Sequence, residues 1–448
     1  MRPMTARQIA GAVGGALHGA GQITAVSTDS RSIPAGSLFV PLRGERFDGH
    51  AYIPQALSAG AAGCLCEALP AELSPDKFYI QVPDTRLALK ALAAWYRNQF
   101  AIPFVQITGS VGKTTTKEMV AAVLSQRYDV LATRGNFNND IGVPLTLFGL
   151  EEKHQVAVIE SGMNHFGEIR YLGEMIRPDI AVITNIGDAH MEYLGSREGI
   201  LQAKCEIFEN LRPETGLAVL NGDDVLLQSL CLPFDTVLCG LGEHCGVRVE
   251  DVVDRGVQGI TCTVTTERGT YPLEIPALGV HMVYPAAMAV AIGEKLGLTA
   301  EEIRRGVAAY QPAGSRMRIL RCTQGRILLD DCYNANPQSV EAALRVLAKE
   351  DHTVAVLGDM NELGELSERA HREIGSLAKE LGIGALVAVG EKARAMAEGA
   401  AGMETHWFPD TAQAMDTIRG LFQPGAVLLV KASHAMHFES IVEGLQSL

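Results

Sequence analysis

The sequence predicts an α/β protein of several domains, built on parallel sheets whose strands alternate with helices. Short apolar runs recur between stretches in which apolar residues follow helical spacing, and this alternation is typical of parallel α/β sheets. The chain has 448 residues, which is too long for one hydrophobic core and suits two to four domains. Hydrophobic residues make up 47% and charged residues 20%, so the composition is that of a globular protein and not of a disordered one.

We expect three segments, and the first covers residues 1–83. It contains the apolar stretch Ile9–Ala20, in which Ile9, Val13 and Leu17 follow helical spacing, so we expect a small amphipathic helix. A secretory signal peptide fits less well, because a strongly basic start is lacking and a histidine interrupts the apolar run. Two short strands and one exposed loop are also expected: Ser37–Leu42, Phe78–Val82 and Arg43–His50.

The second segment, residues 84–312, has the clearest alternation of strands and helices. Its expected strands are Pro103–Ile107, Val156–Ile159, Ile180–Thr184 and Leu217–Leu220, followed by a β-rich excursion at Val247–Leu278. Its expected helices are Leu87–Phe100, Thr114–Tyr128 and a stretch near Pro285–Leu296. This order predicts a parallel sheet with helices between its strands.

The third segment, residues 313–448, repeats the alternation and predicts a second α/β unit of Rossmann type. Its expected strands are Ile327–Leu329, Val354–Leu357, Leu386–Val389 and Val427–Val430. No internal repeat or low-complexity tract interrupts this organisation.

Composition also excludes several classes of protein. The net charge is −14, so the chain is a poor general binder of nucleic acid or anionic membranes. Its nine cysteines form no Cys-x-x-Cys pair, which favours reduced thiols in the cytosol over a disulfide framework or a zinc site. No stretch reaches the roughly 18 apolar residues of a membrane span. We therefore expect a cytoplasmic protein, and we expect it to act as a monomer.

A loop between an expected strand and an expected helix carries a phosphate-binding pattern, Gly109-Ser-Val-Gly-Lys-Thr114. Gly109 and Gly112 permit a backbone whose successive N–H groups point at phosphate oxygens, helped by the N-terminus of the helix. Lys113 adds a positive charge, and the Thr114 hydroxyl can hold Mg²⁺. The strict Walker pattern needs a further glycine two residues before Gly109, where this chain has isoleucine, but strand, loop and helix agree with an ATP site.

Residues that could hold Mg²⁺ follow two neighbouring strands. Glu160 ends the expected strand Val156–Ile159, and His190 follows the expected strand Ile180–Thr184. Both belong to the carboxyl edge of the sheet, where parallel sheets bind ligands. The residues alone leave other interpretations open: a capping carboxylate for Glu160, a hydrogen-bonded loop residue for His190, and a helix-surface lysine for Lys204.

The phosphate loop and its surroundings resemble those of the Mur ligases, cytoplasmic enzymes that add amino acids to the growing peptidoglycan precursor. The loop motif is Thr108-Gly-Ser-Val-Gly-Lys-Thr-Thr-Thr-Lys-Glu118. Further signatures spread over almost the whole chain: Asp29-Ser-Arg31, Gly36-Ser-Leu-Phe-Val40, Asp48-Gly-His50, Gly135-Asn-Phe-Asn-Asn139, Ile141-Gly-Val-Pro144, Asn164-His-Phe-Gly-Glu-Ile169, Asp330-Asp-Cys-Tyr-Asn-Ala-Asn-Pro337 and Gly358-Asp-Met-Asn-Glu-Leu-Gly364. The last two runs are typical of the family member that adds D-alanyl-D-alanine.

The resemblance implies a task for each segment. Residues 1–83 would form a small α/β domain that binds the UDP moiety of the precursor. Residues 84–312 would form a central ATP-binding domain with a parallel sheet like that of P-loop ATPases. Residues 313–448 would form a C-terminal Rossmann-like domain. The implied fold class is therefore α/β with three domains.

The resemblance also implies roles for individual residues. The residues implied in catalysis are Lys113, Glu160, His190 and Lys204. ATP would be bound by Gly109, Ser110, Val111, Gly112, Lys113, Thr114, Thr115, His281, Arg316 and Asp331. The precursor and acceptor would contact Ser30, Arg31, Asn138, Asn139, Asn334 and Asn336.

Two Mg²⁺ ions would be held by Thr114, Glu160, His190 and a carbamylated Lys204. A carbamate offers Mg²⁺ an anionic oxygen ligand, whereas a lysine ammonium would be repelled. A lowered pKa of Lys204 would supply the neutral amine that reacts with CO₂.

The chain departs from the family pattern at two positions. Pro285 stands where the family has an asparagine whose side chain helps to hold adenine, and proline offers no donor there. Near the C-terminus, Lys431-Ala-Ser-His434 replaces the usual Lys-Gly-Ser-Arg. His434 is a weaker and titratable cation, so we expect weaker or more pH-dependent substrate binding.

The implied reaction joins D-alanyl-D-alanine to UDP-N-acetylmuramoyl-tripeptide at the expense of ATP, through an acyl phosphate. One alternative is another ligase of the superfamily, such as the tripeptide-forming Mur ligase or a folylpolyglutamate synthase. An Asp-Asn-Pro-Arg acceptor signature, which the tripeptide-forming ligase carries, is not evident, and Asn334-Ala-Asn-Pro337 favours the dipeptide-adding type. A second alternative is a nucleotide-binding regulator without ligase activity.

Overall fold

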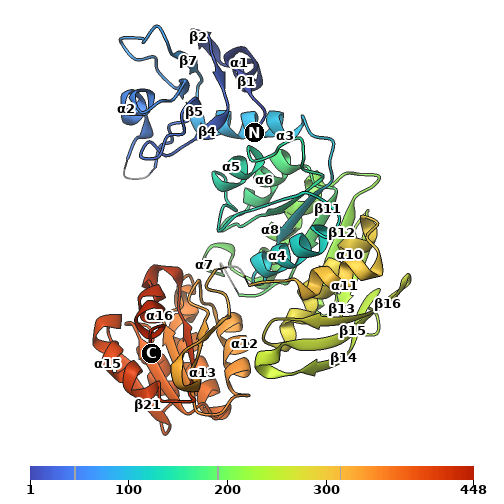
Figure 1. Ribbon diagram of the computed structural model, residues 1–448, viewed down its shortest axis with the longest axis vertical. Helices are drawn as coiled ribbons and strands as arrows, with labels where there is room; N and C mark the ends of the chain where they lie inside the picture. The colour runs from blue at the N-terminus through green and yellow to red at the C-terminus, as the bar shows by residue number, and fades with distance from the viewer. Residues whose placement is uncertain (45–46, 189–190, 313) are drawn as a thin grey trace.

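The computed structural model describes residues 1–44, 47–188, 191–312 and 314–448 and confirms the α/β class (Figure 1). Three groups of elements follow one another along the longest axis of the molecule, from the N-terminal group through the central one to the C-terminal group. Each of the three larger sheets takes its strands from one of the three expected segments. The domain boundaries after residues 83 and 312 stay predictions.

In the first group, the described strands of the main sheet have the order β2-β7-β6-β5-β4. Their bounds are Ala16–His18 (β2), Ala25–Ser27 (β4), Ser37–Phe39 (β5), Gly63–Cys66 (β6) and Phe78–Gln81 (β7). Met4–Thr5 (β1) pairs with Gln22–Ile23 (β3), and α2 covers Ile53–Ser58. The sheet carries the strands expected near Ser37 and Phe78.

The helix expected within Ile9–Ala20 is wrong in its second half. Helix α1 covers Ala6–Val13 and ends at Gly14, whose φ of 65° places it in the left-handed region that terminates helices. Leu17 therefore lies on strand β2 and not on the helix. Helical spacing of three apolar residues did not reveal the two glycines that end the helix.

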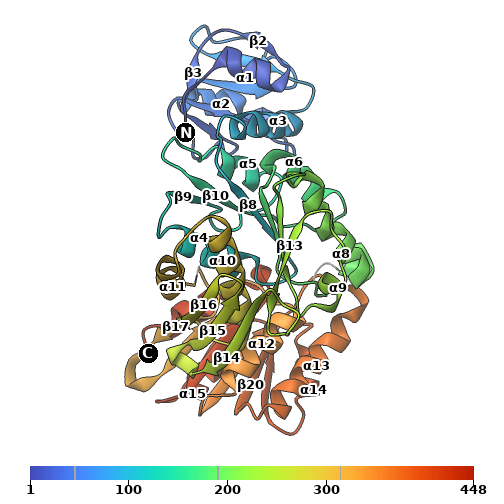
Figure 2. The same cartoon turned by 90° about the vertical axis from the view of Figure 1, so that its right-hand side faces the viewer.

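Helix α3 (Thr85–Arg97) joins the first group to the central one (Figure 2). It lies between the first sheet and helices α5 (Gly142–Leu147) and α6 (Glu168–Ile176). Its buried face contributes Leu89, Leu92 and Tyr96 to one hydrophobic core that draws on both groups. The Tyr96 hydroxyl donates to the Leu150 carbonyl at 2.7 Å and accepts from the Arg2 amide at 2.6 Å. One continuous core thus fixes the first group on the second.

The described strands of the central sheet have the order β16-β15-β14-β13-β12-β11-β8-β10-β9. Their bounds are Phe104–Thr108 (β8), Val130–Ala132 (β9), Val156–Glu160 (β10), Ile180–Ile183 (β11), Leu217–Asn221 (β12), Asp235–Gly240 (β13), Val247–Asp254 (β14), Ile260–Thr266 (β15) and Gly269–Ile275 (β16). Strands β9 to β14 and β8 run parallel, whereas β14, β15 and β16 pair antiparallel as the expected β-rich excursion. Strand β8 lies between β10 and β11, so the strand order reverses there, and parallel sheets bind ligands at such a point.

Helices cover the central sheet on both sides. Helices α4 (Lys113–Leu124) and α10 (Val283–Lys295) share one core with the strands, and α11 (Ala300–Ala308) packs beside them. Helices α7 (Met191–Leu194), α8 (Arg197–Cys205) and α9 (Val225–Gln228) follow β11 and β12. Among the described residues, no helix is both long and apolar enough to cross a membrane.

The third group has the strand order β17-β18-β22-β19-β20-β21, with β17 antiparallel and the other described strands parallel. The strands are Arg318–Arg321 (β17), Ile327–Asp330 (β18), Thr353–Gly358 (β19), Ala385–Val389 (β20), Glu404–Phe408 (β21) and Val427–Lys431 (β22). The helices are Pro337–Leu347 (α12), Ser367–Glu380 (α13), Arg394–Gly399 (α14), Thr411–Leu421 (α15) and Glu439–Leu445 (α16). This is the second parallel α/β unit that the sequence predicts.

Candidate active site

A cavity of about 960 Å³ lies between the central group and the third group. The carboxyl edge of the central sheet contributes the phosphate loop and Glu160, and the third group contributes residues that follow β18, β19 and β22. The cavity brings together most of the residues expected to bind ATP or substrate: Ser110, Val111, Gly112, Lys113, Thr114, Thr115, Asn138, Asn139, Glu160, His281, Arg316, Asp331, Asn334 and Asn336. Parallel sheets bind ligands at their carboxyl edges, and this cavity has two such edges.

The phosphate loop between β8 and α4 is held in one conformation by the residues that follow β11. The Val111 amide donates to Asn185 Oδ1 at 2.9 Å, and the Thr184 hydroxyl donates to the Val111 carbonyl at 2.6 Å. Gly109 has a φ of 151° and Gly112 a φ of 80°, a region that favours glycine. A Cβ atom at Gly109 would also overlap the Thr184 hydroxyl. The loop therefore requires glycine at position 109 on two independent grounds.

Lys113 begins helix α4 and folds back over the loop. Its ammonium donates to the Gly109 carbonyl at 2.7 Å. Desolvation lowers the pKa of Lys113, and the charge of Glu160 opposes this shift. The cation is thus held at the centre of the loop, where the phosphate oxygens of a nucleotide would meet it.

Glu160 is the most enclosed carboxylate at this edge, with 2% of its surface exposed. The Thr114 hydroxyl donates to its Oε2 at 2.7 Å, and the Asn138 amide donates to its Oε1 at 2.8 Å. The Glu160 amide donates to the Thr133 hydroxyl at 3.0 Å, which fixes the backbone as well. A buried carboxylate beside a hydroxyl fits Mg²⁺, which prefers oxygen ligands.

Lys204 lies on helix α8 and is almost fully buried, with 1% exposed. Burial, and then the charge of Lys113, hold the pKa of Lys204 well below its usual value. This is the environment in which a lysine becomes a neutral amine, as carbamylation would need. His190, the other residue expected to bind metal, lies outside the described residues.

The third group contributes charged and aromatic side chains to one wall of the cavity, and these side chains contact one another. The Arg316 guanidinium stacks over the Tyr333 ring, 3.6 Å from its centroid. Lys431 donates to Asp331 Oδ2 at 2.6 Å and to the Asn334 carbonyl at 2.9 Å. Asn336 accepts from the Ser339 amide at 2.9 Å and caps helix α12. Arg316 and Asp331 therefore reach the cavity on a framework that Lys431 and the helix cap hold in place.

Asn139 and Pro285, two further positions singled out in the sequence, also line the cavity. Asn139 Oδ1 accepts from the Ile141 and Gly142 amides at 3.2 and 2.8 Å just before and at the start of helix α5, so its orientation is fixed. Pro285 is buried in the first turn of α10, and the neighbouring Tyr284 hydroxyl donates to Asp223 Oδ2 at 3.0 Å. His281, Tyr284 and Pro285 line one part of the cavity.

Ser30 and Arg31 do not reach this cavity, because they belong to the first group. Arg31 is 86% exposed and pairs with Asp29, whose pKa it lowers to about 2 through hydrogen bonding. Both residues lie in the loop that follows β4, a strand of the first sheet. Their expected role in binding the UDP moiety stays a prediction.

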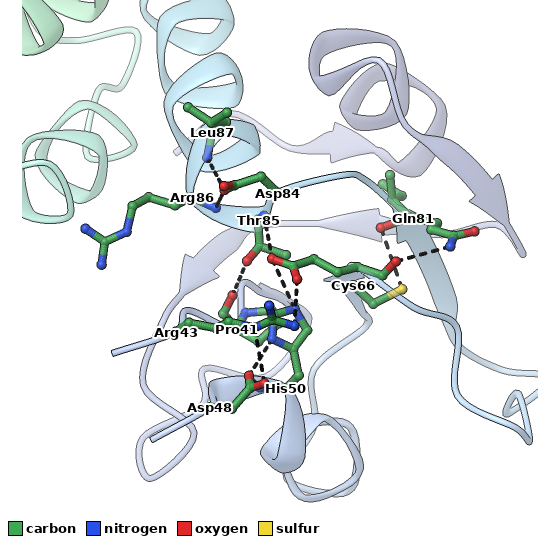
Figure 3. Close-up of polar contacts among 12 residues, drawn as sticks. Pro41, Arg43, Asp48, His50, Cys66, Gln81, Asp84, Thr85, Arg86 and Leu87 are labelled. Carbon is green, nitrogen blue, oxygen red and sulfur yellow. Dashed lines mark hydrogen bonds and ion pairs between the residues drawn. The ribbon is translucent and has the colours of Figure 1, made fainter. Parts of the chain in front are cut away.

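The loop with the Asp48-Gly-His50 motif is tied to the start of α3 by polar contacts (Figure 3). His50 Nδ1 lies 2.7 Å from Asp48 Oδ1, and Arg43 pairs with Asp48 at 3.2 Å. The Thr85 hydroxyl donates to the Pro41 carbonyl at 2.6 Å, and Asp84 caps the helix. This part of the first group is therefore positioned by α3, the helix whose core continues into the central group.

Three family models match successive parts of the chain. They are "Mur ligase family, catalytic domain" for residues 22–97, "Mur ligase middle domain" for residues 107–293 and "Mur ligase, glutamate ligase domain" for residues 315–434. The UDP-N-acetylmuramoyl-tripeptide–D-alanyl-D-alanine ligase of Bacillus subtilis (strain 168) is 38% identical over 433 residues, 94% of this chain and 93% of its own. The chain belongs to the Mur ligase family.

Other relatives of this Mur ligase match over the full length. The ligase of the same name from Escherichia coli (strain K12) is 37% identical and covers 100% of this chain and 99% of its own. The crystal structure of MurF from Acinetobacter baumannii has a TM-score of 0.93 at 35% identity, over 100% of this chain and 99% of that one. A MurF ligase from Thermotoga maritima in complex with ADP has a TM-score of 0.84 at 25% identity, over 94% of this chain and 97% of that one.

Sequence reasoning missed several residues that shape the site of this Mur ligase. Thr184 and Asn185 hold the phosphate loop, and Thr133 holds the backbone of Glu160. The carboxyl-edge rule could have found Thr184 and Asn185, because both stand directly after β11. Thr133 follows β9, whose apolar run of three residues is too short to predict a strand.

Proposed function

We propose that this Mur ligase joins D-alanyl-D-alanine to UDP-N-acetylmuramoyl-tripeptide and converts ATP to ADP and phosphate in the same reaction. This would be the last peptide-forming step in the cytoplasmic synthesis of the peptidoglycan precursor. The names and full-length coverage of the relatives support the substrate pair. The Asp330–Pro337 and Gly358–Gly364 runs, typical of the dipeptide-adding type, support it from the sequence.

One observation carries the proposal: the phosphate loop and Glu160 face Arg316 and Asp331 across a single cavity. A ligase of this kind must hold a nucleotide, a carboxylate and an amine together, away from water. Two sheet edges that meet at one cavity leave room for the carboxylate and the amine beside the nucleotide.

In the proposed mechanism, the γ-phosphoryl group passes from ATP to the terminal carboxylate of the tripeptide and forms an acyl phosphate. The amine of the dipeptide then attacks the acyl carbon, and the tetrahedral intermediate expels phosphate and leaves an amide. The amides of residues 112 and 113 and the Lys113 ammonium would hold the phosphate oxygens. No covalent enzyme nucleophile is needed, so positioning and charge neutralisation supply the catalysis.

We further propose that Thr114 and Glu160 hold one Mg²⁺ ion, and that His190 and a carbamylated Lys204 complete the sites for two ions. The metal would neutralise the negative charge that gathers where phosphate and carboxylate meet. Asn138, which donates to Glu160, would keep that carboxylate turned toward its ligand. The low pKa of Lys204 favours the neutral amine that a carbamate requires.

The remaining sequence-based roles are proposals of the same kind. Ser30 and Arg31 would bind the UDP moiety, and Asn139 would lie on the path of the tripeptide. Asn334 and Asn336 would shape the acceptor side. The three domains would act as one cytoplasmic monomer.

The experiment is a phosphate-release assay with purified protein, Mg-ATP, UDP-N-acetylmuramoyl-tripeptide and D-alanyl-D-alanine. We expect phosphate release that needs both organic substrates, and a product whose mass equals the sum of both minus water. Release with a different acceptor amino acid alone would move the protein to another ligase of the family. Nucleotide binding without any substrate-dependent release would favour a regulator.

A further inference from the structure

A second cluster of side chains that can bind a metal lies outside the cavity, beside strands β12, β13 and β14 of the central sheet. Asp223 follows β12, whereas His244 and Cys245 lie in the loop between β13 and β14. The carboxylate, the imidazole and the thiol each offer one ligand atom, and these atoms all lie within 4.8 Å of one another. None of the three side chains lines the cavity, so the cluster is separate from the candidate active site.

His244 is held in the tautomer that a metal ligand needs. Its Nε2 atom lies 2.8 Å from the Gly222 carbonyl oxygen, which can only accept, so Nε2 carries the proton. The lone pair of the neutral imidazole is then left on Nδ1. Metal-binding histidines are oriented in the same way, because they donate their other ring N–H to a carbonyl or a carboxylate.

The Asp223 carboxylate is fixed by three hydrogen bonds. The Gly242 amide donates to Oδ1 at 2.9 Å, and the Leu241 amide and the Tyr284 hydroxyl donate to Oδ2 at 2.7 and 3.0 Å. The other neighbour of Oδ1 is the Cys245 thiol, whose sulfur lies 4.0 Å away. A thiol is a weak donor, so a cation between Oδ1 and the sulfur would displace only a weak contact.

Two glycines leave the space that the three ligand atoms surround. A Cβ atom at Gly242 would lie 2.7 Å from His244 Nδ1 and 3.0 Å from Asp223 Oδ1. A Cβ atom at Gly222 would lie 2.5 Å from the sulfur of Cys245. Any other residue at either position would therefore crowd the ligand atoms, whereas glycine lets them approach one another.

We propose that Asp223, His244 and Cys245 bind one divalent cation of the zinc type through Oδ1, Nδ1 and Sγ. Carboxylate oxygen, imidazole nitrogen and thiolate sulfur are the ligands that zinc takes in proteins, and one water molecule completes a tetrahedral set. Mg²⁺ competes poorly, because it prefers an octahedron of oxygen ligands. On binding, the S–H bond breaks, a metal–sulfur bond forms and the thiol proton passes to solvent.

The ligand atoms need only a small movement to close around the cation. Zinc bonds of about 2.0 to 2.3 Å in a tetrahedron place the ligand atoms about 3.3 to 3.8 Å apart. Because the atoms lie within 4.8 Å, the site closes when they approach by about 1 Å. His244 is exposed and belongs to a loop, so the imidazole can make this movement. Cys245 is only 7% exposed, so the sulfur forms the fixed side of the site.

Burial, and then the charge of Asp223, raise the pKa of the Cys245 thiol. The thiol is thus protonated and unreactive without a cation. A bound cation reverses this, because its charge stabilises the thiolate and offsets that of the carboxylate. The cluster therefore combines a carboxylate and a thiol that gain a common partner when a metal binds.

Tyr284 links the cluster to the cavity of the candidate active site. Its hydroxyl donates to Asp223 Oδ2, and its side chain lines the cavity beside Pro285. The cation binds Oδ1, so the contact between Oδ2 and Tyr284 remains. The metal supports a residue that lines the cavity but lies outside the cavity itself, which makes this a structural site.

The test is a titration of the full chain, first freed of metal, with Zn²⁺ in the presence of excess Mg²⁺. We expect one strongly bound equivalent with a dissociation constant of about 10 μM or lower, weaker than a site with four protein ligands. Co²⁺ in place of Zn²⁺ should give the absorption band of a cobalt–thiolate bond, which sites with only oxygen and nitrogen ligands lack. Zn²⁺ should also raise the unfolding midpoint, because it binds only the folded chain.

Two variants remove a ligand each, and two matched variants control for them. Cys245→Ser should abolish the cobalt–thiolate band, and both Cys245→Ser and His244→Ala should weaken Zn²⁺ binding by about tenfold or more. Cys231→Ser changes an exposed cysteine, and His406→Ala changes a histidine on the edge strand β21. Both controls should keep the band and the affinity of the wild type.

The proposal is overturned if the wild type gives no cobalt–thiolate band, or if Cys245→Ser keeps it. It is also overturned if both ligand variants bind Zn²⁺ as tightly as the wild type. The unfolding midpoints of the metal-free proteins check that each variant folds. The measurements do not depend on ligase activity, so they test the metal site independently of the proposed function.

Discussion

The two walls of the cavity differ in how far the side chains that line them are buried and hydrogen-bonded to one another. On the central wall, Thr114, Asn138 and Glu160 already bond to one another, and the carboxylate is 2% exposed. On the third-group wall, Glu362 and His434 stand exposed on loops that are themselves pinned. The central wall is thus preorganised, whereas the third-group wall combines fixed loops with exposed side chains. Preorganisation is needed most where charge develops in the transition state.

The largest effect should come from Lys113→Ala, which removes the cation at the centre of the phosphate loop. We expect kcat to fall by about a thousandfold or more, because phosphoryl transfer depends on electrostatic stabilisation. The phosphate-release assay measures this. Lys295→Ala, at the exposed end of α10, is the matched control and should keep full activity. Retained turnover in Lys113→Ala would mean that another loop binds the phosphates.

The next largest effect should come from Glu160 and the side chains that are hydrogen-bonded to it. We expect Glu160→Gln to raise the Mg²⁺ concentration for half-maximal activity by more than about tenfold, because the neutral amide is a poor ligand. Asn138→Ala should act in the same direction but less, since Asn138 orients Glu160 and is not expected to bind the metal itself. Activity titrated against Mg²⁺ separates the two. Equal effects of both variants would contradict a direct role for Glu160.

A smaller effect is expected from Thr184→Val, which removes the hydroxyl that donates to the Val111 carbonyl. A neutral hydrogen bond contributes about 1 kcal/mol, so KM for ATP should rise about fivefold. KM for the dipeptide should stay constant, because Thr184 lies behind the phosphate loop and the third-group wall is untouched. A change in both constants would show that the two walls are coupled.

The smallest effect is expected for the exposed ion pair between Arg31 and Asp29 in the first group. Arg31→Ala should return the pKa of Asp29 from about 2 toward its ordinary value of 3.8. A carboxyl whose folded pKa is depressed stabilises the fold above its unfolded pKa, and the gain is lost as pH falls through the folded value. In wild type this loss lies between about pH 4 and pH 2, and it should shrink in the variant. NMR titration of Asp29 measures the shift. An unchanged pKa would show that Arg31 does not hold this carboxyl.

Much of the fold could be predicted because its parallel strands are continuous apolar runs. Strands such as β10 and β22 are buried along their whole length and stand out in the sequence. Edge strands such as β9 and β21 are only partly buried and gave no such signal. The start of α1 followed its apolar spacing, whereas its end depended on the left-handed conformation of Gly14.

The candidate site could be predicted in part for the same reason. Glu160 and the phosphate loop stand at strand ends, so their approach follows from parallel topology. The pairing of Asn361 with Ser433 joins residues 72 positions apart through two loops, and no local pattern encodes it. The burial of Lys204 is likewise a property of how α8 packs and not of its own sequence.

The most direct measurement follows one oxygen atom from substrate to product. The terminal carboxylate of the UDP-tripeptide would be labelled with ¹⁸O and supplied with ATP, Mg²⁺ and D-alanyl-D-alanine. If an acyl phosphate forms, one labelled oxygen must leave with the phosphate when the amine attacks. We therefore predict singly labelled phosphate in an amount equal to the peptide product, by mass spectrometry. Unlabelled phosphate would mean that water attacked the nucleotide, and it would contradict a carboxylate-activating ligase.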